Sequence, residues 1–131
     1  MALKIGAIFI EDPVILAPMS GVTDLPFRDL VKSFGAGLVV SEMVASAAVI
    51  EANKRTKKML EFRKSGSPIS IQLMGRDPGT MAEAAMLCQD LGADIIDINF
   101  GCPVRQVTER NKSGSYLLGQ PQQMGKIIEQ V

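Results

Sequence analysis

The chain has 131 residues, of which 47% are apolar and 21% are charged, and its 14 basic and 14 acidic side chains give a formal net charge of zero. This length suffices for one ordinary domain with its own core, and the zero net charge gives no bulk electrostatic signal for nucleic acid. The chain has no histidine, which excludes zinc chemistry and histidine-based triads, and the spacing of Cys88 and Cys102 matches no metal signature.

The N-terminal residues do not resemble a signal peptide, since residues 1–10 carry one lysine and are followed at once by Glu11 and Asp12. No apolar run approaches the ~20 residues that a helix needs to cross a bilayer. We therefore expect a cytoplasmic protein without membrane association, in which both thiols are reduced and no metal is bound.

Four short apolar runs have the composition of strands in a parallel sheet. A weakly alternating stretch, Lys4–Ile10, precedes them and predicts a short strand or hairpin arm. The expected strands are Val14–Ala17, Leu38–Ser41, Ile69–Leu73 and Ile95–Ile98. Because Val14–Ala17 is wholly apolar, we expect it to be buried on both faces.

Helices are expected between and after these strands. Asp24 and Asp77 are N-cap residues, each with a proline in the first turn that follows. One helix is expected over residues 47–62, a turn over 65–68 and a polar loop over 104–115, and Pro121 begins the last helix. The predicted apolar faces are Phe27, Leu30, Val31 and Phe34; Met81, Ala84, Ala85, Cys88 and Leu91; and Met124, Ile127, Ile128 and Val131.

The alternation of strand and helix with short connections predicts parallel strands joined by right-handed crossovers. A TIM-type (β/α)8 barrel needs eight strands and usually ~250 residues. We therefore predict an α/β fold made of the first four βα units of such a barrel, with a short N-terminal β arm. Its two unpaired edges predict self-association or pairing with a missing C-terminal half. An open doubly wound sheet is the alternative, but the first βα turn lacks a glycine-rich phosphate fingerprint.

Polar side chains at the carboxyl ends of the four strands should face one common mouth. These residues are Pro18, Met19 and Ser20; Glu42; Gln72; and Asn99 with Cys102. An amide such as Gln72 in an apolar strand needs hydrogen-bond partners, and it suits either the edge of a planar heterocycle or a core position satisfied by backbone groups. Glu42 is a candidate both for catalysis and for a structural ion pair.

Cys102 carries the most chemical information in the sequence. Gly101 and Pro103 end the preceding strand abruptly and so deliver a thiol at the mouth of the sheet. A nucleophilic thiol needs a neighbouring histidine or cation, and only Arg105 is near in sequence. A thiol without such activation is mostly protonated at neutral pH, so the residues favour a general acid. Cys88, on a helical apolar face, is expected in the core.

Several motifs in order resemble the tRNA-dihydrouridine synthase family. They are 17–24 (APMSGVTD), 41–43 (SEM), 71–73 (IQL), 97–103 (DINFGCP) and 113–115 (SGS). The resemblance runs from about Ile5 to the last residue, and the order and spacing of the motifs make it specific. It implies that residues 1–131 are the N-terminal half of a flavin-binding barrel, without its second half and C-terminal helical tRNA-binding domain.

The resemblance also implies a reaction. In the family, NADPH reduces FMN, the reduced flavin passes hydride to C6 of a uracil base in tRNA, and a loop cysteine protonates C5. Carried over to this chain, Cys102 is the proton donor, Gln72 bonds the isoalloxazine edge, and Asn99 contacts a base flipped out of its stack. The flavin would lie against Pro18, Met19 and Ser20. Apart from the resemblance, the position of Arg105, Arg110 and Lys112 beside the Cys102 loop makes them better candidates for contact with tRNA phosphates than the basic residues of 54–64.

Two features leave alternatives open. The family's loop usually ends in Gly-Ser-Ala-Leu-Leu, whereas this chain has Tyr116 after Gly-Ser and about one extra residue within 108–112, so Tyr116 either crowds the site or stacks a base. The basic cluster over residues 54–64 is either a solvated helix face or a tRNA contact. The competing functions are another FMN barrel oxidoreductase acting on a free pyrimidine or an enone, and an inactive half-barrel that needs a partner.

Overall fold

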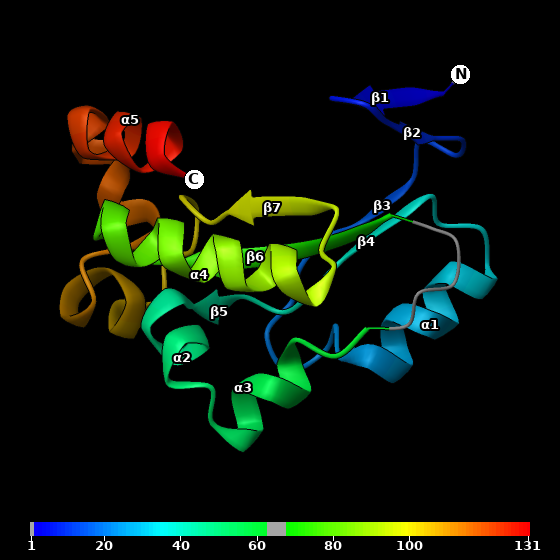
Figure 1. Ribbon diagram of the computed structural model, residues 1–131, viewed down its shortest axis with the longest axis horizontal. Helices are drawn as coiled ribbons and strands as arrows, with labels where there is room; N and C mark the ends of the chain where they lie inside the picture. The colour runs from blue at the N-terminus through cyan, green and yellow to red at the C-terminus, as the bar shows by residue number, and fades with distance from the viewer. Residues whose placement is uncertain (1, 63–67) are drawn as a thin grey trace.

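The computed structural model describes residues 2–62 and 68–131 and shows a parallel sheet covered by helices (Figure 1). Its strands are β1 (Leu3–Ile5), β2 (Ile8–Ile10), β3 (Ile15–Leu16), β4 (Leu38–Val40), β5 (Val44–Ala45), β6 (Ile69–Met74) and β7 (Ile95–Ile98). Its helices are α1 (Leu25–Ser33), α2 (Ser46–Glu51), α3 (Lys54–Met59), α4 (Pro78–Leu91) and α5 (Pro121–Gln130), with a π-helical segment η1 (Gln106–Arg110) and a 3-10 segment η2 (Gly114–Gly119).

The strands of the large sheet are parallel and follow one another in chain order. β3 pairs with β4, β4 and β5 pair with one side of β6, and β7 pairs with its other side. A doubly wound sheet reverses its strand order at a switch point, and the described strands contain no such reversal. The arrangement is that of four βα units of a TIM-type barrel, which confirms the predicted fold class.

The N-terminal arm is a separate antiparallel hairpin of β1 and β2, in which Leu3 faces Ile10. Gly6 supplies the left-handed backbone, at φ +58°, that the tight turn requires. The arm is anchored where the chain enters the sheet, since Ile10 is buried and a Cβ on Gly37 would overlap the carbonyl oxygen of Asp12. The predicted hairpin arm is therefore confirmed.

The core lies between the sheet and α2, α4 and α5. Every residue of β6 is buried, and α4 packs four fully or nearly fully buried side chains toward it, Met81, Ala84, Ala85 and Cys88. Asp77 caps α4 by accepting from the backbone N–H of Thr80 at 2.8 Å, and Gly92 ends it in a left-handed conformation. Cys88 is thus a core residue, as predicted.

Two predictions about segments are wrong. Only Ile15 and Leu16 of the first apolar run form a strand, and Ile15 is 43% exposed, because β3 is the edge strand and pairs with β4 alone. The single helix expected over 47–62 is two helices. Ala52 adopts a left-handed conformation that ends α2, and Asn53 then caps α3 by accepting from the N–H of Thr56 at 2.9 Å.

Other boundaries differ because tertiary contacts add structure to polar stretches. The loop expected over 104–115 contains η1 and the beginning of η2, and the short strand β5 was not predicted at all. The predicted apolar faces are only partly buried. Each helix packs a narrow row of side chains toward the interior, and the side chains on either side of that row are exposed to solvent. The exposed members are Leu30, Phe34, Leu91, Ile128 and Val131. Residues 65–67 of the turn predicted over 65–68, and the basic residues 63 and 64, lie outside the described residues.

None of the described helices has the length and apolar composition that crossing a bilayer demands.

We predict that Cys88 makes stability depend on alkaline pH. Burial raises the pKa of its thiol to about 11, from an ordinary value of 9.0. Between these two values the unfolded chain releases this proton and the folded chain keeps it, so the free energy of unfolding falls as pH rises, by at most about 2–3 kcal/mol. Urea unfolding at pH 8 and pH 10.5 measures this fall.

Cys88→Ala is the control, because it removes the titrating thiol while adding a pH-independent cost for the small cavity. Its free energy of unfolding should fall less steeply over the same interval. Equal slopes for the parent chain and the variant would show that Cys88 does not titrate in this way.

Candidate functional site

The carboxyl ends of the parallel strands meet at one edge of the sheet, and hydrogen bonds join each strand end to the next. These bonds run from Gly21 N to Glu42 Oε1 (2.6 Å), from Gln72 N to Ser41 Oγ (3.0 Å), and from Asn99 N to Leu73 O (2.9 Å). The structure therefore brings together the residues predicted to face the mouth after β3, β4, β6 and β7.

Ser41 explains how Glu42 reaches the mouth. β4 and β5 pair with the same side of β6 but are separated by residues 41–43. The buried Ser41 hydroxyl fills this interruption, since it accepts from Gln72 N and donates to the carbonyl of Glu42 at 2.8 Å. Sequence reasoning missed this role. The available signal was a small hydroxyl residue at the end of an apolar run.

The loop after β3 has a fixed backbone and exposed side chains. The fully buried Thr23 closes it, because its hydroxyl accepts from Met19 N at 3.1 Å and donates to Met19 O at 3.2 Å. Gly21, at φ +77°, allows the turn. Pro18 is half-buried, whereas Met19 and Ser20 are exposed. The loop can therefore offer a preformed surface to a ligand.

Arg28 lies beneath this loop and was not predicted as a site residue. It is buried and donates to the backbone carbonyls of Thr23, at 2.7 Å, and of Glu61. Burial lowers the pKa of its guanidinium, and the charge of Glu42 opposes that shift. Glu42 thus accepts a hydrogen bond from Gly21 N, and its charge favours the cationic form of Arg28. No sequence signal distinguishes Arg28 from an exposed helix arginine.

Two side-chain amides form a relay across β6 and β7. Gln72 Nε2 donates to Asp97 Oδ2 at 2.5 Å, and Asn99 Nδ2 donates to Gln72 Oε1 at 3.0 Å. Gln72 and Asp97 are direct partners in the parallel register, and Gln72 is buried. The expectation that this buried amide has partners is confirmed, and the partners of its amide are side chains rather than backbone groups.

The relay ends at the loop that carries Cys102. Asn99 Oδ1 accepts from Cys102 N at 3.0 Å and from Gly101 N at 3.3 Å. On the other side, Ser115 N donates to Cys102 O at 3.0 Å. Gly114 makes this approach possible: its φ is +59°, and a Cβ there would lie 2.6 Å from Cys102 O. The half-buried Cys102 is therefore held between two backbone anchors.

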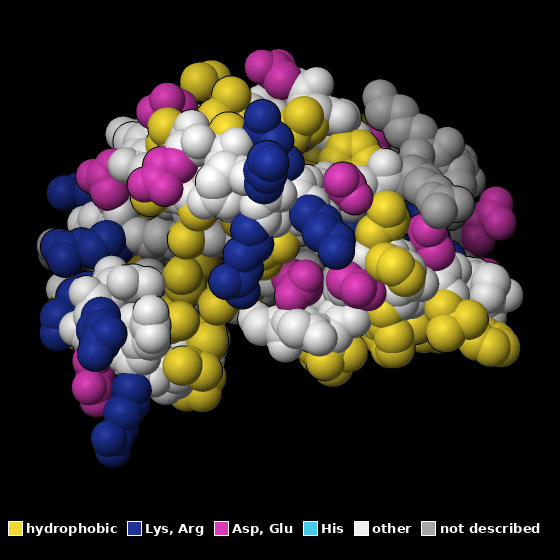
Figure 2. All heavy atoms as spheres, turned by 90° about the horizontal axis from the view of Figure 1, so that it is seen from below, with side chains coloured by type: hydrophobic (Ala, Val, Ile, Leu, Met, Phe, Trp, Pro, Cys, Tyr) yellow, Lys and Arg dark blue, Asp and Glu magenta, His cyan; other side chains and the backbone are white. Residues whose placement is uncertain are grey.

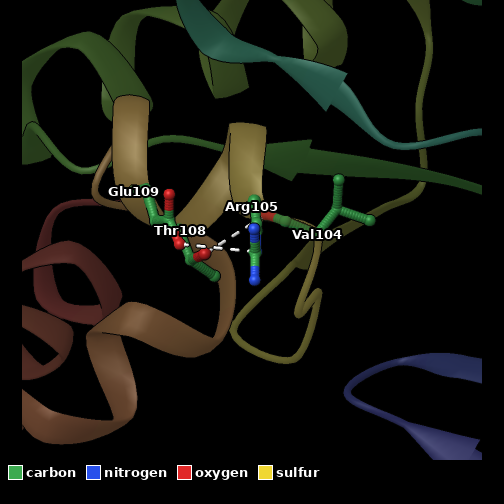
Figure 3. A network of polar contacts seen from close by, with 4 residues as sticks. All are labelled: Val104, Arg105, Thr108 and Glu109. Atoms are coloured by element: carbon green, nitrogen blue, oxygen red, sulfur yellow. Dashed lines mark hydrogen bonds and ion pairs between the residues drawn. The ribbon is translucent and has the colours of Figure 1, made fainter.

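Arg105 lies three residues beyond Cys102, at the start of η1, and points into solvent. Its side chain is 90% exposed and its Nε lies 3.7 Å from Glu109 Oε1, while Thr108 N and its hydroxyl both donate to Val104 O (Figure 3). An exposed pair of this kind contributes at most about 1 kcal/mol, so Arg105 is free to exchange Glu109 for another anion.

Two groups of basic side chains bear on the site, one on α3 and one near the Cys102 loop. Figure 2, seen from the side of α3, shows Lys and Arg side chains over the middle of the molecule and toward its left end. The four basic residues of α3, residues 54, 55, 57 and 58, are all exposed. Near the Cys102 loop, the ammonium of Lys112 lies 5.1 Å from the ring centroid of Tyr116, which is 41% exposed.

Within the described part of the chain, no three Cys, Asp or Glu side chains gather where they could hold a metal ion. The mouth presents the thiol of Cys102, the amides of Gln72 and Asn99, and the carboxylates of Glu42 and Asp97. Its most specific element is the thiol anchored by the amide relay.

The sequence profile of the dihydrouridine synthase (Dus) family matches residues 15–131, which contain this whole arrangement. The chain belongs to the dihydrouridine synthase family. It is 48% identical over 133 aligned residues to a probable tRNA-dihydrouridine synthase of Rhodobacter capsulatus, covering all of this chain and 40% of the relative. The predicted resemblance is confirmed.

Two further relatives show similar identity and coverage. A probable tRNA-dihydrouridine synthase of Rickettsia conorii is 51% identical over 128 residues, with 97% of this chain and 38% of the relative covered. The tRNA-dihydrouridine synthase B of Pseudomonas syringae pv. tomato is 42% identical over 130 residues, with 99% and 38% covered. The chain thus spans about two-fifths of the length of these Dus relatives.

We predict that Gly114→Ala destabilises the Cys102 loop. The left-handed backbone costs an alanine about 1–2 kcal/mol, and the new methyl group would crowd Cys102 O and Val107 Cγ1. We expect the free energy of unfolding in urea to fall by about 2 kcal/mol or more.

Gly119→Ala, at the other end of η2, is the matched control, because its Cβ would meet no atom within 4 Å. Its effect should stay within about 1 kcal/mol. Equal losses in the two variants would contradict the role given to Gly114.

Proposed function

We propose that this chain forms the N-terminal half of the flavin-binding barrel of a tRNA-dihydrouridine synthase, which uses FMN and NADPH to reduce the C5=C6 bond of a uridine in tRNA. The observation that carries the proposal is Cys102, anchored by Asn99 and Gln72 at the mouth of the sheet in a chain of the Dus family. On this proposal, adjoining sequence supplies the other strands and a C-terminal helical tRNA-binding domain.

The residues at the mouth fit a flavin ring. Pro18 and Met19 offer apolar surface on a fixed backbone, Ser20 is exposed beside them, and Gln72 retains one amide N–H beyond the one given to Asp97. These four residues would hold the isoalloxazine. FMN, when bound there in its reduced form, would supply the hydride for C6 of the uracil.

Cys102 would hold the proton for C5. Its thiol is half-buried and sits on an anchored loop, so it can face a substrate in one geometry. Among the described ion pairs and hydrogen bonds, none joins a cation to this thiol, and Arg105 pairs with Glu109 instead. This environment supports a proton donor over an activated nucleophile.

The substrate would be a uridine in tRNA. C5 and C6 cannot be reached inside a stacked helix, so the base has to be presented unstacked at the mouth. Asn99, next to the thiol, would contact it. Arg105, with its weakly held guanidinium, would take a phosphate together with Arg110 and Lys112. The names of the relatives specify tRNA and so favour this substrate over a free pyrimidine or an enone.

The decisive experiment uses the protein expressed from its complete gene and separates the two half-reactions. Cys102→Ala should leave flavin reduction by NADPH unchanged and slow flavin reoxidation by unmodified tRNA by roughly 10²–10⁴-fold, as expected for loss of a general acid. Stopped-flow flavin absorbance measures both rates.

Cys88→Ala is the control, because that thiol is in the core. Equal slowing of both half-reactions by Cys102→Ala would refute the assigned role. Unchanged dihydrouridine in tRNA after deletion of the gene would refute the proposed function as a whole.

We further predict that the basic residues near the Cys102 loop, rather than those of α3, bind RNA phosphates. In the same protein, Arg105→Ala should weaken tRNA binding and reduce the slope of log K against log salt by about 1. Lys54→Ala and Lys57→Ala on α3 should leave the slope unchanged. Fluorescence anisotropy of labelled tRNA over 50–200 mM salt measures it, and the opposite pattern would assign the contact to α3.

A further inference from the structure

The amide relay has a polarity that is fixed at both ends. Asp97 faces Gln72 with a carboxylate oxygen, which accepts a hydrogen bond, and Gln72 turns its Nε2 toward that oxygen at 2.5 Å. At the far end, the backbone N–H groups of Gly101 and Cys102 only donate, so Asn99 must turn its Oδ1 toward them. The remaining bond, Asn99 Nδ2 to Gln72 Oε1, satisfies both demands.

The two ends specify the same orientation independently, which settles the ambiguity between O and N that a lone amide has. Had Gln72 presented Oε1 to Asp97, two acceptors would face each other. Had Asn99 presented Nδ2 to Cys102, two donors would meet. Because Gln72 is buried on a paired strand, it has little access to water that could repair either conflict.

The relay leaves one N–H group on each amide nitrogen without a partner inside the relay. Gln72 Nε2 and Asn99 Nδ2 each have two N–H bonds and each spends one within the relay. Both amides are thus set to donate to a ligand. Carbonyl oxygens, such as those on the edge of a uracil or an isoalloxazine, are matching acceptors.

We propose that Asp97 is a positioning residue: by holding Gln72 it holds Asn99 against the Cys102 loop, in the polarity in which the two amides offer N–H donors to a carbonyl-bearing edge. The ligand part rests on the proposed function. The positioning part does not, because it concerns contacts within the chain.

Asp94 provides a matched control on the same two strands. Its Oδ2 accepts from Ile69 N at 2.9 Å, which joins the segment before β7 to the beginning of β6. Asp97 joins the same strands nearer their carboxyl ends, from which the chain continues to the Cys102 loop. The two aspartates therefore stabilise the same strand pair and differ in which end they hold.

The test is hydrogen exchange at individual backbone amides of this chain, read by NMR without flavin or RNA. Asp97→Ala should accelerate exchange at Gly101 and Cys102 by about tenfold, the equivalent of one lost hydrogen bond. Asp94→Ala should accelerate exchange at Ile69 and leave Cys102 unchanged. Asp97→Asn, whose Oδ1 still accepts from Gln72, should exchange like the parent chain.

Equal exchange at Cys102 in the two alanine variants would overturn the proposal, because Asp97 would then be merely structural. So would an Asp97→Asn variant that behaves like Asp97→Ala. Should Asp97→Ala fail to fold, Gln72→Met interrupts the relay with a side chain of similar volume and carries the same expectation at Cys102.

The variant Asn99→Asp tests the polarity of the amide relay separately. The new carboxylate still accepts from Cys102 N but faces Gln72 Oε1, so two acceptors meet and exchange at Cys102 should accelerate about tenfold at neutral pH. With the opposite polarity, Gln72 Nε2 would donate to the carboxylate and exchange would stay slow, which would overturn the assignment. If the relay passes both tests but the complete protein does not reduce tRNA, only the proposed function fails.

Discussion

The parallel register between β6 and β7 is the constraint on which the rest of the site depends. It sets Gln72 opposite Asp97 and Leu73 opposite Ile98, so the next residue of β7's chain, Asn99, reaches both Gln72 and the backbone of β6. Because side chains alternate along a strand, a slip of one residue would turn Gln72 and Asp97 to opposite faces. The thiol loop would then lose its anchor.

The site depends on β6 because β6 is the central strand. It pairs on both sides and is buried along its whole length, yet it contains Ser70 and Gln72. A buried amide without partners is costly, and here Asp97 and Asn99 remove that cost while they orient the amide. Among the described residues, no buried side-chain nitrogen or oxygen lacks a hydrogen-bond partner. The polar mouth is therefore part of what makes the sheet stable, and not an addition to it.

The sequence predicted well wherever one residue's chemistry decides the local structure. Asp77 with the following proline predicted the start of α4, and Cys88 on an apolar face predicted a core thiol. It predicted poorly where contacts between distant residues decide. The break at Ala52 between α2 and α3, the exposure of Ile15 on an edge strand and the helical turn of η1 all depend on which neighbours are present. The burial of Arg28 could not be predicted, because nothing in the local sequence pattern separates a buried arginine from an exposed one.

By itself the sequence determined the α/β class, the order of its four βα units, the family and the residues at the strand ends, because periodicity, caps and spaced motifs are local properties of a chain. Only the tertiary structure decided how those residues act on one another. It placed Asp97 against Gln72 and Asn99 against Cys102, and it turned the carboxylate of Glu42 toward Gly21. Hydrogen-bond direction depends on which donor faces which acceptor in space, and that is settled only when strands 25 residues or more apart in sequence lie side by side.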